Sequence, residues 1–360
     1  MIRSAYIHIP FCTHICTYCD FTKVYYQKDW ISKYLKSLKK EIVANYQNEV
    51  LDTIYIGGGT PSALTVSELQ ELFETLKILK RSNSLEYTIE CNLENLTEEK
   101  LDLFKKYGIN RLSIGVQTFQ NRLLKFLGRE TCDIKIISYA KKIGFQNINV
   151  DLIYALPNQT IEDLKDDLEK FLKLEITHIS TYSLMIEPHT ILYNRKVNPI
   201  DQDLDYQMYQ TICKTLKEHG YEHYEISNFS KPGFESKHNL TYWNNFEYYG
   251  FGVGASGYTN RVRYTNTKSI TKYLNGTFER EKELITKQDQ MVYEMILGLR
   301  KLKGVSCKDF YQKYGQTIEK TFHLGKLRNQ HQVKSDGNFI WIPEDLLYVS
   351  NDILVEFVGE

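Results

Sequence analysis

Three cysteines near the N-terminus, Cys12, Cys16 and Cys19, have the spacing C-x3-C-x2-C. Thiolates are the usual ligands of iron–sulfur clusters, which commonly take four, so three cysteines leave one iron able to bind another ligand. A zinc site completed by His14 and a chance group of buried thiols are the alternatives, but the sequence has no second ligand pair at knuckle spacing. The spacing therefore favours a [4Fe–4S] cluster with one open iron.

A run of glycines, Gly57-Gly58-Gly59, precedes Thr60 and follows a short apolar segment. Successive glycines let the backbone approach a ligand without obstruction by Cβ atoms, although such a run alone is equally typical of a tight turn before a helix. Beside the cysteines, Gly58, Gly59 and Thr60 become candidates for contact with a ligand at the open iron.

Three polar residues, Glu90, Gln117 and Asp151, lie in or at the ends of successive apolar segments. Any one of them is as typical of a hydrogen-bonded core residue as of a ligand contact, because buried polar groups are normally paired. Their recurrence at comparable strand positions predicts one shared pocket.

The elements that would position these residues follow a β/α alternation up to about residue 185. Hydroxyl residues at Thr65 and Thr97, each followed by acidic residues, predict the starts of two of the helices. Six strands with crossover helices favour a partial (β/α)6 TIM-like barrel over a closed eight-stranded one. The predicted strands are 5–9, 53–56, 87–91, 111–116, 148–153 and 178–183, and the predicted helices are 28–47, 65–80, 97–107, 132–143 and 160–173.

The alternation weakens after residue 185, and residues 221–265, rich in Tyr, Asn, Gly and Phe, favour irregular strands and loops over another crossover. From about residue 285 the pattern is helical, and Asp336-Gly337 ahead of an apolar run predicts a hairpin. We therefore expect a barrel core over 1–185, a barrel extension over 186–284 and a small helix-plus-hairpin, wing-like domain over 285–360.

The composition excludes several classes of protein. Lys plus Arg and Asp plus Glu number 45 each, so no net field favours binding to nucleic acid or to an anionic membrane. No secretory signal and no apolar run of membrane-spanning length are recognisable, and the odd cysteine count of seven suits metal ligation in a reducing compartment. The prediction is a cytoplasmic protein without a transmembrane segment.

The segment Cys12–Cys19 resembles the signature of the radical S-adenosylmethionine (SAM) superfamily. That resemblance implies a barrel whose [4Fe–4S] cluster binds SAM through its amino and carboxyl groups and cleaves it reductively to a 5′-deoxyadenosyl radical. The flanking residues, Tyr6 to Phe11 and Cys19-Asp20-Phe21, resemble the branch that contains oxygen-independent coproporphyrinogen III oxidases and HemW-type heme chaperones.

The same resemblance implies a set of SAM contacts. Leu93 and Ala155 depart from the branch, which often has proline and glycine at these positions. The implied contacts are Tyr6, Tyr18, Gly58, Gly59, Thr60, Glu90, Gln117, Arg129, Asp151, Met185, Gly254 and Ala255.

Three features bear on the choice within this branch. Phe21 stands where the oxidase pattern has a further cysteine, and we expect no oxidase-type N-terminal extension ahead of the first strand. The motif HNLTYW resembles the heme-binding signature of the chaperones, and imidazole with flat aromatic faces suits heme, although a histidine beside such residues is also common in a core. Its candidate heme contacts are His238, Asn239, Tyr242 and Trp243.

The features together predict a heme chaperone that passes heme to acceptor hemoproteins, such as respiratory ones. An oxygen-independent coproporphyrinogen III oxidase is the alternative, with its activity disfavoured by Phe21. A third possibility is a radical SAM enzyme with another substrate and a purely structural HNLTYW segment. The sequence is compatible with a monomer and with a homodimer, and with transient contact with a membrane.

Overall fold

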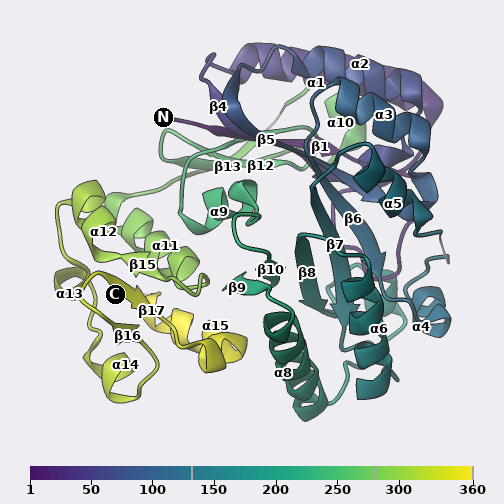
Figure 1. The fold of residues 1–360 in the computed structure, drawn as a ribbon. Helices are drawn as coiled ribbons and strands as arrows, with labels where there is room; N and C mark the ends of the chain where they lie inside the picture. Colours follow the sequence, from purple (N-terminus) through teal and green to yellow (C-terminus); the bar gives the residue numbers. More distant parts are fainter. Residues whose placement is uncertain (131–132, 279, 359–360) are drawn as a thin grey trace.

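Six parallel strands form the centre of the protein in the computed structural model, which describes residues 1–130, 133–278 and 280–358. Figure 1 shows these strands as one curved, twisted layer with helices on its outer face. The partial barrel predicted from the β/α alternation is confirmed. In spatial order the strands are β1 (Ser4–Ile9), β4 (Leu51–Gly58), β5 (Arg81–Asn92), β6 (Arg111–Gln117), β7 (Asn147–Tyr154) and β8 (His178–Ser183).

Crossover helices connect the strands and bury apolar faces against them, as parallel sheets require. Thr65 and Thr97 cap their helices as predicted, since each hydroxyl accepts the backbone N–H three residues later. The predicted helix over 132–143 begins at a residue outside the described ones. The helices are α1 (Lys28–Asn45), α2 (Val66–Leu76), α3 (Glu98–Lys106), α4 (Asn121–Phe126), α5 (Lys135–Lys142), α6 (Ile161–Lys173), α7 (Ile191–Asn194) and α8 (Gln202–Glu218), with short 3-10 turns η1 (Pro61–Ala63) and η2 (Leu93–Asn95).

The central segment is more regular than the sequence predicts. β11 (Tyr249–Phe251) adds a parallel strand beside β1, and HNLTYW lies in a short helix, α9 (Lys237–Trp243). The strand β11 forms because it pairs with β1, and local composition does not reveal such long-range pairing. The other elements here are β9 (Glu222–Glu225), β10 (Asn228–Ser230), β12 (Ser256–Thr259), β13 (Val262–Asn266), α10 (Ile270–Leu274) and β14 (Arg280–Leu284). Near the N-terminus, β2 (Phe11–Cys12) and β3 (Val24–Tyr25) form a separate parallel pair.

The C-terminal residues pack around a second hydrophobic cluster, which contains buried side chains from Met291 to Phe357. Figure 1 shows these elements gathered beside β9 and α8, away from the barrel helices. The turn at Asp336-Gly337 joins two paired strands, as the sequence predicts, whereas the domain boundaries stay predictions. The elements are α11 (Lys287–Gly298), β15 (Val305–Ser306), α12 (Cys307–Tyr314), α13 (Ile318–Thr321), α14 (Gly325–Asn329), β16 (Lys334–Ser335), β17 (Phe339–Trp341), η3 (Glu344–Val349), α15 (Ser350–Leu354) and η4 (Val355–Phe357).

Candidate functional site

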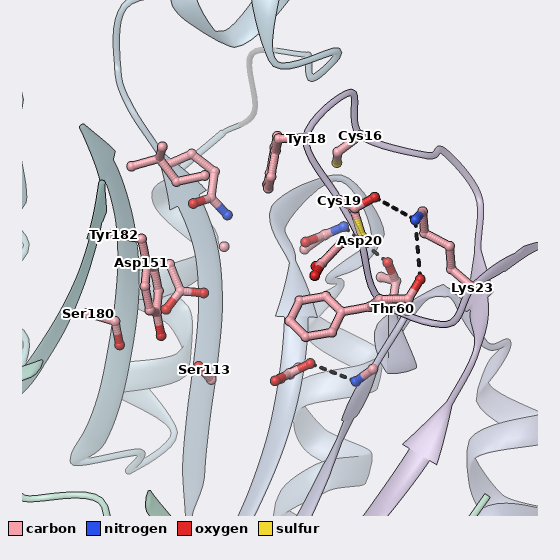
Figure 2. A pocket seen from close by; sticks show the side chains of 18 of the residues that line it. Cys16, Tyr18, Cys19, Asp20, Lys23, Thr60, Ser113, Asp151, Ser180 and Tyr182 are labelled. Atoms are coloured by element: carbon pink, nitrogen blue, oxygen red, sulfur yellow. Dashed lines mark hydrogen bonds between the residues drawn. The ribbon is translucent and has the colours of Figure 1, made fainter. Parts of the chain in front are cut away.

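A cavity of about 330 Å³ opens among the carboxyl ends of the parallel strands and continues into the barrel. Side chains of successive strand residues alternate between the two faces of a sheet, so every second residue of each strand faces inward. In Figure 2 the loop carrying Cys16 and Cys19 faces Asp151 and Tyr182 across this space. Active sites of parallel barrels lie at this end of the strands, which makes the cavity the candidate functional site.

The loop after β2 brings Cys12, Cys16 and Cys19 to the wall of the cavity. Cys12 is buried, and the Thr60 hydroxyl lies 3.5 Å from its sulfur. The Lys23 ammonium donates to the carbonyl of Cys19 at 2.6 Å and to that of Phe21 at 3.2 Å, which fixes the end of the loop (Figure 2). Burial raises the pKa of the Cys12 thiol to about 11, so a positive partner such as iron is needed to hold it as a thiolate.

The three cysteine sulfurs are suited to a cluster. In the described part of the chain, no group of three or more His, Cys, Asp or Glu side chains converges as it would on one metal ion. A [4Fe–4S] cluster gives each cysteine its own iron, so the sulfurs need only surround one space. Three thiols on one loop, facing one cavity, meet that requirement.

The glycine run lies directly against the cysteine loop. A Cβ atom on Gly59 would lie 2.7 Å from the Pro10 carbonyl and 2.9 Å from the Cys12 sulfur. Gly58 has φ +117° and its backbone N–H donates to Glu90 Oε2 at 2.9 Å. Glycine is therefore required here by contacts within the protein, and Gly58, Gly59 and Thr60 also line the cavity.

Two buried carboxyl groups, Glu90 and Asp151, face the cavity from β5 and β7. Glu90 accepts from the Tyr55 hydroxyl at 2.8 Å as well as from Gly58, and Asp151 accepts from the Asn149 amide at 2.8 Å. Burial raises the pKa of Glu90 to about 7 and raises that of Asp151. Glu90 can therefore exchange a proton with a bound ligand near neutral pH, and both groups can form hydrogen bonds with it.

Arg129 and Gln117 complete the polar wall. The Arg129 guanidinium donates to the Tyr18 hydroxyl at 3.3 Å and to the Gly115 carbonyl at 3.2 Å, and it forms an ion pair of 3.8 Å with Glu94. Gln117 has φ +71°, which turns the chain at the end of β6, and its buried side-chain oxygen has no hydrogen-bond partner among the described residues. An orphaned buried acceptor facing a cavity marks a place for a ligand donor.

The remaining predicted SAM contacts differ in position. Met185 lines the cavity and is 69% exposed. Tyr6 is absent from the lining, because its hydroxyl bonds the His8 ring at 3.0 Å within the barrel wall. Gly254 and Ala255 also lie outside the lining, and Gly254 packs against Thr22, which follows the cysteine loop.

The HNLTYW helix closes the opposite end of the barrel from the cysteines. His238 is buried, with Nδ1 bonded to the Thr53 hydroxyl at 2.7 Å and Nε2 to the Tyr242 hydroxyl at 2.8 Å. Its ring stacks on Tyr55 at 5.0 Å, and burial lowers its pKa to about 3. In this conformation both ring nitrogens are occupied, so neither is available to bind iron unless its hydrogen bond is broken.

The other members of the motif have separate surroundings. Asn239 lines the cavity, so α9 contributes to the same space as the cysteine loop. Trp243 lies near Arg300 of the C-terminal elements, and its indole N–H has no hydrogen-bond partner among the described residues. The motif therefore spans the barrel interior and its border with the C-terminal elements.

Several residues that line the cavity were not predicted from the sequence. Arg111, Ser113, Asn149, Ser180 and Tyr182 all face the cavity from β6, β7 and β8. Arg111 and Ser113 could have been predicted from Gln117. In a strand every second residue faces the same side, so Arg111, Ser113 and Gln117 all face inward from β6.

The comparisons with known proteins agree with this fold and site. The profile of the radical SAM superfamily matches residues 6–171, and that of the HemN C-terminal domain matches residues 285–343. The solved structure of coproporphyrinogen III oxidase (HemN) from Escherichia coli superposes with a TM-score of 0.87 over 99% of this chain and 90% of that one, at 22% identity, which establishes the shared fold. Fold and site thus define a radical SAM protein.

Among proteins of known name, heme chaperone HemW of Lactococcus lactis is 42% identical over 99% of this chain and 97% of its own length. HemW of Bacillus subtilis is 39% identical over the full length of both chains, and HemW of Escherichia coli is 33% identical over 76% of both. The chain belongs to the HemW family. Membership in the radical SAM superfamily implies a [4Fe–4S] cluster and SAM. Within the described ranges, no helix has the length and apolarity to span a membrane.

Proposed function

We propose that this protein is a heme chaperone, which binds heme and passes it to acceptor hemoproteins. The observation that carries the proposal is the similarity to HemW of Lactococcus lactis at 42% identity over 99% of this chain and 97% of that protein. Similarity along the whole length covers the barrel, HNLTYW and the C-terminal elements together.

Cys12, Cys16 and Cys19 hold the cluster in this proposal, and bound SAM supplies a 5′-deoxyadenosyl radical when it is cleaved reductively. The Gly58–Thr60 backbone, Glu90, Gln117, Arg129 and Asp151 surround SAM, since each faces the cavity beside the cysteine loop. Glu90, with its pKa raised to about 7, can accept a hydrogen bond from an ammonium group in its ionised form. Tyr6, Gly254 and Ala255 support this site from behind the lining.

HNLTYW would hold heme in this proposal, and His238 is the residue that would bind its iron on giving up its bonds to Thr53 and Tyr242. The His238 ring stacks on Tyr55, whose hydroxyl bonds Glu90. These contacts connect α9 with a residue that would hold SAM.

A protein of this kind works in the cytoplasm, where a reducing environment preserves the thiolate ligands. We propose three domains, namely the barrel core over 1–185, its extension over 186–284 and the C-terminal domain over 285–360. We propose no acceptor beyond the class of hemoproteins, and no oligomeric state.

The test is a hemin titration of the anaerobically reconstituted full chain, followed by the heme absorption band and by transfer to apomyoglobin. His238→Ala should abolish specific binding. The matched control is His178→Ala, because His178 is equally buried and bonds Asn149 at 2.6 Å and Tyr224 at 2.8 Å through its two nitrogens.

Equal loss in both variants would assign His238 a structural role only. Absence of specific hemin binding by the wild type would refute the chaperone proposal. Turnover of coproporphyrinogen III would then test the oxidase alternative, which Phe21 disfavours by standing at the position of the extra cysteine.

A further inference from the structure

Arg111 is an unusual residue within the cavity. It begins β6, only 2% of it is exposed, and its guanidinium lines the cavity at the end opposite the cysteine loop. Its Nε atom is buried without a hydrogen-bond partner, and none of the described residues forms a side-chain hydrogen bond or ion pair with this guanidinium. Arg129 in the same cavity is, by contrast, bonded to Tyr18 and Gly115.

The nearby carboxyl groups do not neutralise Arg111 by direct contact. Glu90 is occupied by Tyr55 and Gly58, and Asp151 by Asn149. Arg111 acts on both only through space, lowering their pKa values as a minor effect against burial. A buried charge without a bonded partner is costly, so a guanidinium held in this way is prepared for a ligand.

The HNLTYW helix brings a second polar group to the same place. Asn239 lines the same cavity as Arg111, while its neighbour His238 bonds Thr53. The charge of Arg111 contributes to lowering the pKa of His238, which places the guanidinium close to α9. The backbone N–H of Asn239 bonds Ser236, whereas its side-chain amide forms no hydrogen bond with any residue that the structure describes.

We propose that Arg111 and Asn239 form a carboxylate-binding subsite at the floor of the barrel. The planar fork of a guanidinium matches a carboxylate with two parallel hydrogen bonds, and an amide N–H adds a third. The carboxylate belongs to a ligand that enters from the open end of the barrel, past the cysteine loop.

A porphyrin can supply this group through a propionate, and in that respect the inference rests on the proposed function. The aminocarboxylate of an adenosyl amino acid is instead expected at the open iron beside the cysteine loop, at the other end of the cavity. A pair of probes of each kind, with and without the acid group, distinguishes the two.

The experiment measures dissociation constants for the anaerobically reconstituted full chain. One pair is protoporphyrin IX and its dimethyl ester, and the other is S-adenosylhomocysteine and 5′-methylthioadenosine, which lacks the aminocarboxylate. In Arg111→Gln, the preference for the free acid in the porphyrin pair should fall by roughly tenfold or more, and the adenosyl preference should stay unchanged. Asn239→Ala should show a smaller loss in the same pair.

Arg81→Gln is the matched control, because Arg81 begins the neighbouring strand β5, also has an unpartnered Nε and does not line the cavity. It should leave both preferences unchanged. Asn239→Asp keeps Arg111 and adds a carboxylate that competes with the ligand for the guanidinium. This variant should therefore reproduce the loss of preference for the acid even where Arg111→Gln folds poorly.

Loss of preference in the porphyrin pair supports a propionate subsite. With a wild type that binds porphyrin, an unchanged porphyrin preference in folded Arg111→Gln and Asn239→Asp, or a loss confined to the adenosyl pair, would overturn the subsite and leave the chaperone proposal standing. A wild type that binds neither porphyrin would refute the chaperone proposal, on which the subsite rests.

Discussion

At the scale of single residues, burial and hydrogen bonding decide which groups are available for chemistry. His238 has the residue type expected of a heme ligand, yet both its nitrogens are bonded inside the protein. Glu90 and Asp151 keep raised pKa values because they are buried, and each retains hydrogen bonds that hold it in place. The residue type alone does not show whether such a group is already hydrogen-bonded within the protein.

His238 should make the stability of the protein depend on pH. Its pKa is about 3 when folded and 6.5 in its ordinary environment, so the stability that depends on the neutral ring is full above pH 6.5 and falls toward pH 3. Between pH 6 and 5 the wild type should lose about 1.2 kcal/mol of unfolding free energy relative to His238→Gln. Urea unfolding at both pH values measures the difference, and a constant difference would contradict the prediction.

Gly59→Ala should prevent cluster assembly. The new Cβ would lie 2.7 Å from the Pro10 carbonyl and 2.9 Å from the Cys12 sulfur, so the cysteine loop has to shift. Iron after anaerobic reconstitution should fall from about four per chain to below about two. Gly325→Ala is the control, since nothing lies within 4 Å of a Cβ there. Full iron loading of Gly59→Ala would show that the loop tolerates the methyl group.

At the scale of elements, the ends of strands carry both strain and ligand contacts. Ala155 follows β7 with φ +57°, the left-handed region in which glycine is favoured. That conformation explains the glycine often found at this position in the branch that the chain resembles. The other departure, Leu93, begins the 3-10 turn η2 after β5, a place that accepts proline.

Ala155→Gly should raise the unfolding free energy by roughly 0.5 to 1 kcal/mol, because relief of left-handed strain exceeds the entropy that glycine adds to the unfolded chain. Ala140→Gly is the opposite control. Ala140 is buried within α5, where the same change should cost about 1 kcal/mol. Denaturant unfolding of both variants checks the signs, and a destabilised Ala155→Gly would mean that its buried methyl group contributes more than the strain costs.

At the scale of the whole molecule, two hydrophobic clusters are joined by a narrow backbone contact. The Ile226 N–H donates to the Arg300 carbonyl at 3.0 Å, and the Leu302 N–H donates to the Tyr224 carbonyl at 3.2 Å. Trp243 approaches Arg300 at the same border, so the HNLTYW helix contacts the C-terminal elements as well as the barrel.

Phe310→Ala should loosen the C-terminal elements selectively. Phe310 is fully buried in the second cluster, and its removal should cost about 3 to 5 kcal/mol. Hydrogen exchange should accelerate by roughly a hundredfold or more across residues 291–357 and stay unchanged in β5, β6 and β7. Equal acceleration in the barrel strands would instead show that the chain opens as one unit.

Much of this architecture is predictable from local patterns. The six strands, the helix caps at Thr65 and Thr97 and the hairpin at Asp336-Gly337 follow from periodicity and short-range hydrogen bonding. The strand β11 and the helix α9 were not predicted, because the pairing of β11 with β1 and the Glu86 bonds to the backbone of α9 are long-range. Arg111 was also missed, since nothing local marks a guanidinium that lacks a partner.

The sequence by itself determined the cysteine spacing, the glycine run and the β/α order, because these depend on residues close together along the chain. Only the tertiary structure decided that Tyr6 lies outside the cavity lining, that His238 is bonded on both nitrogens and that Arg111 shares a cavity with Asn239. The bond from His238 to Thr53 and the cavity shared by Arg111 and Asn239 join segments more than a hundred residues apart, which no local pattern specifies.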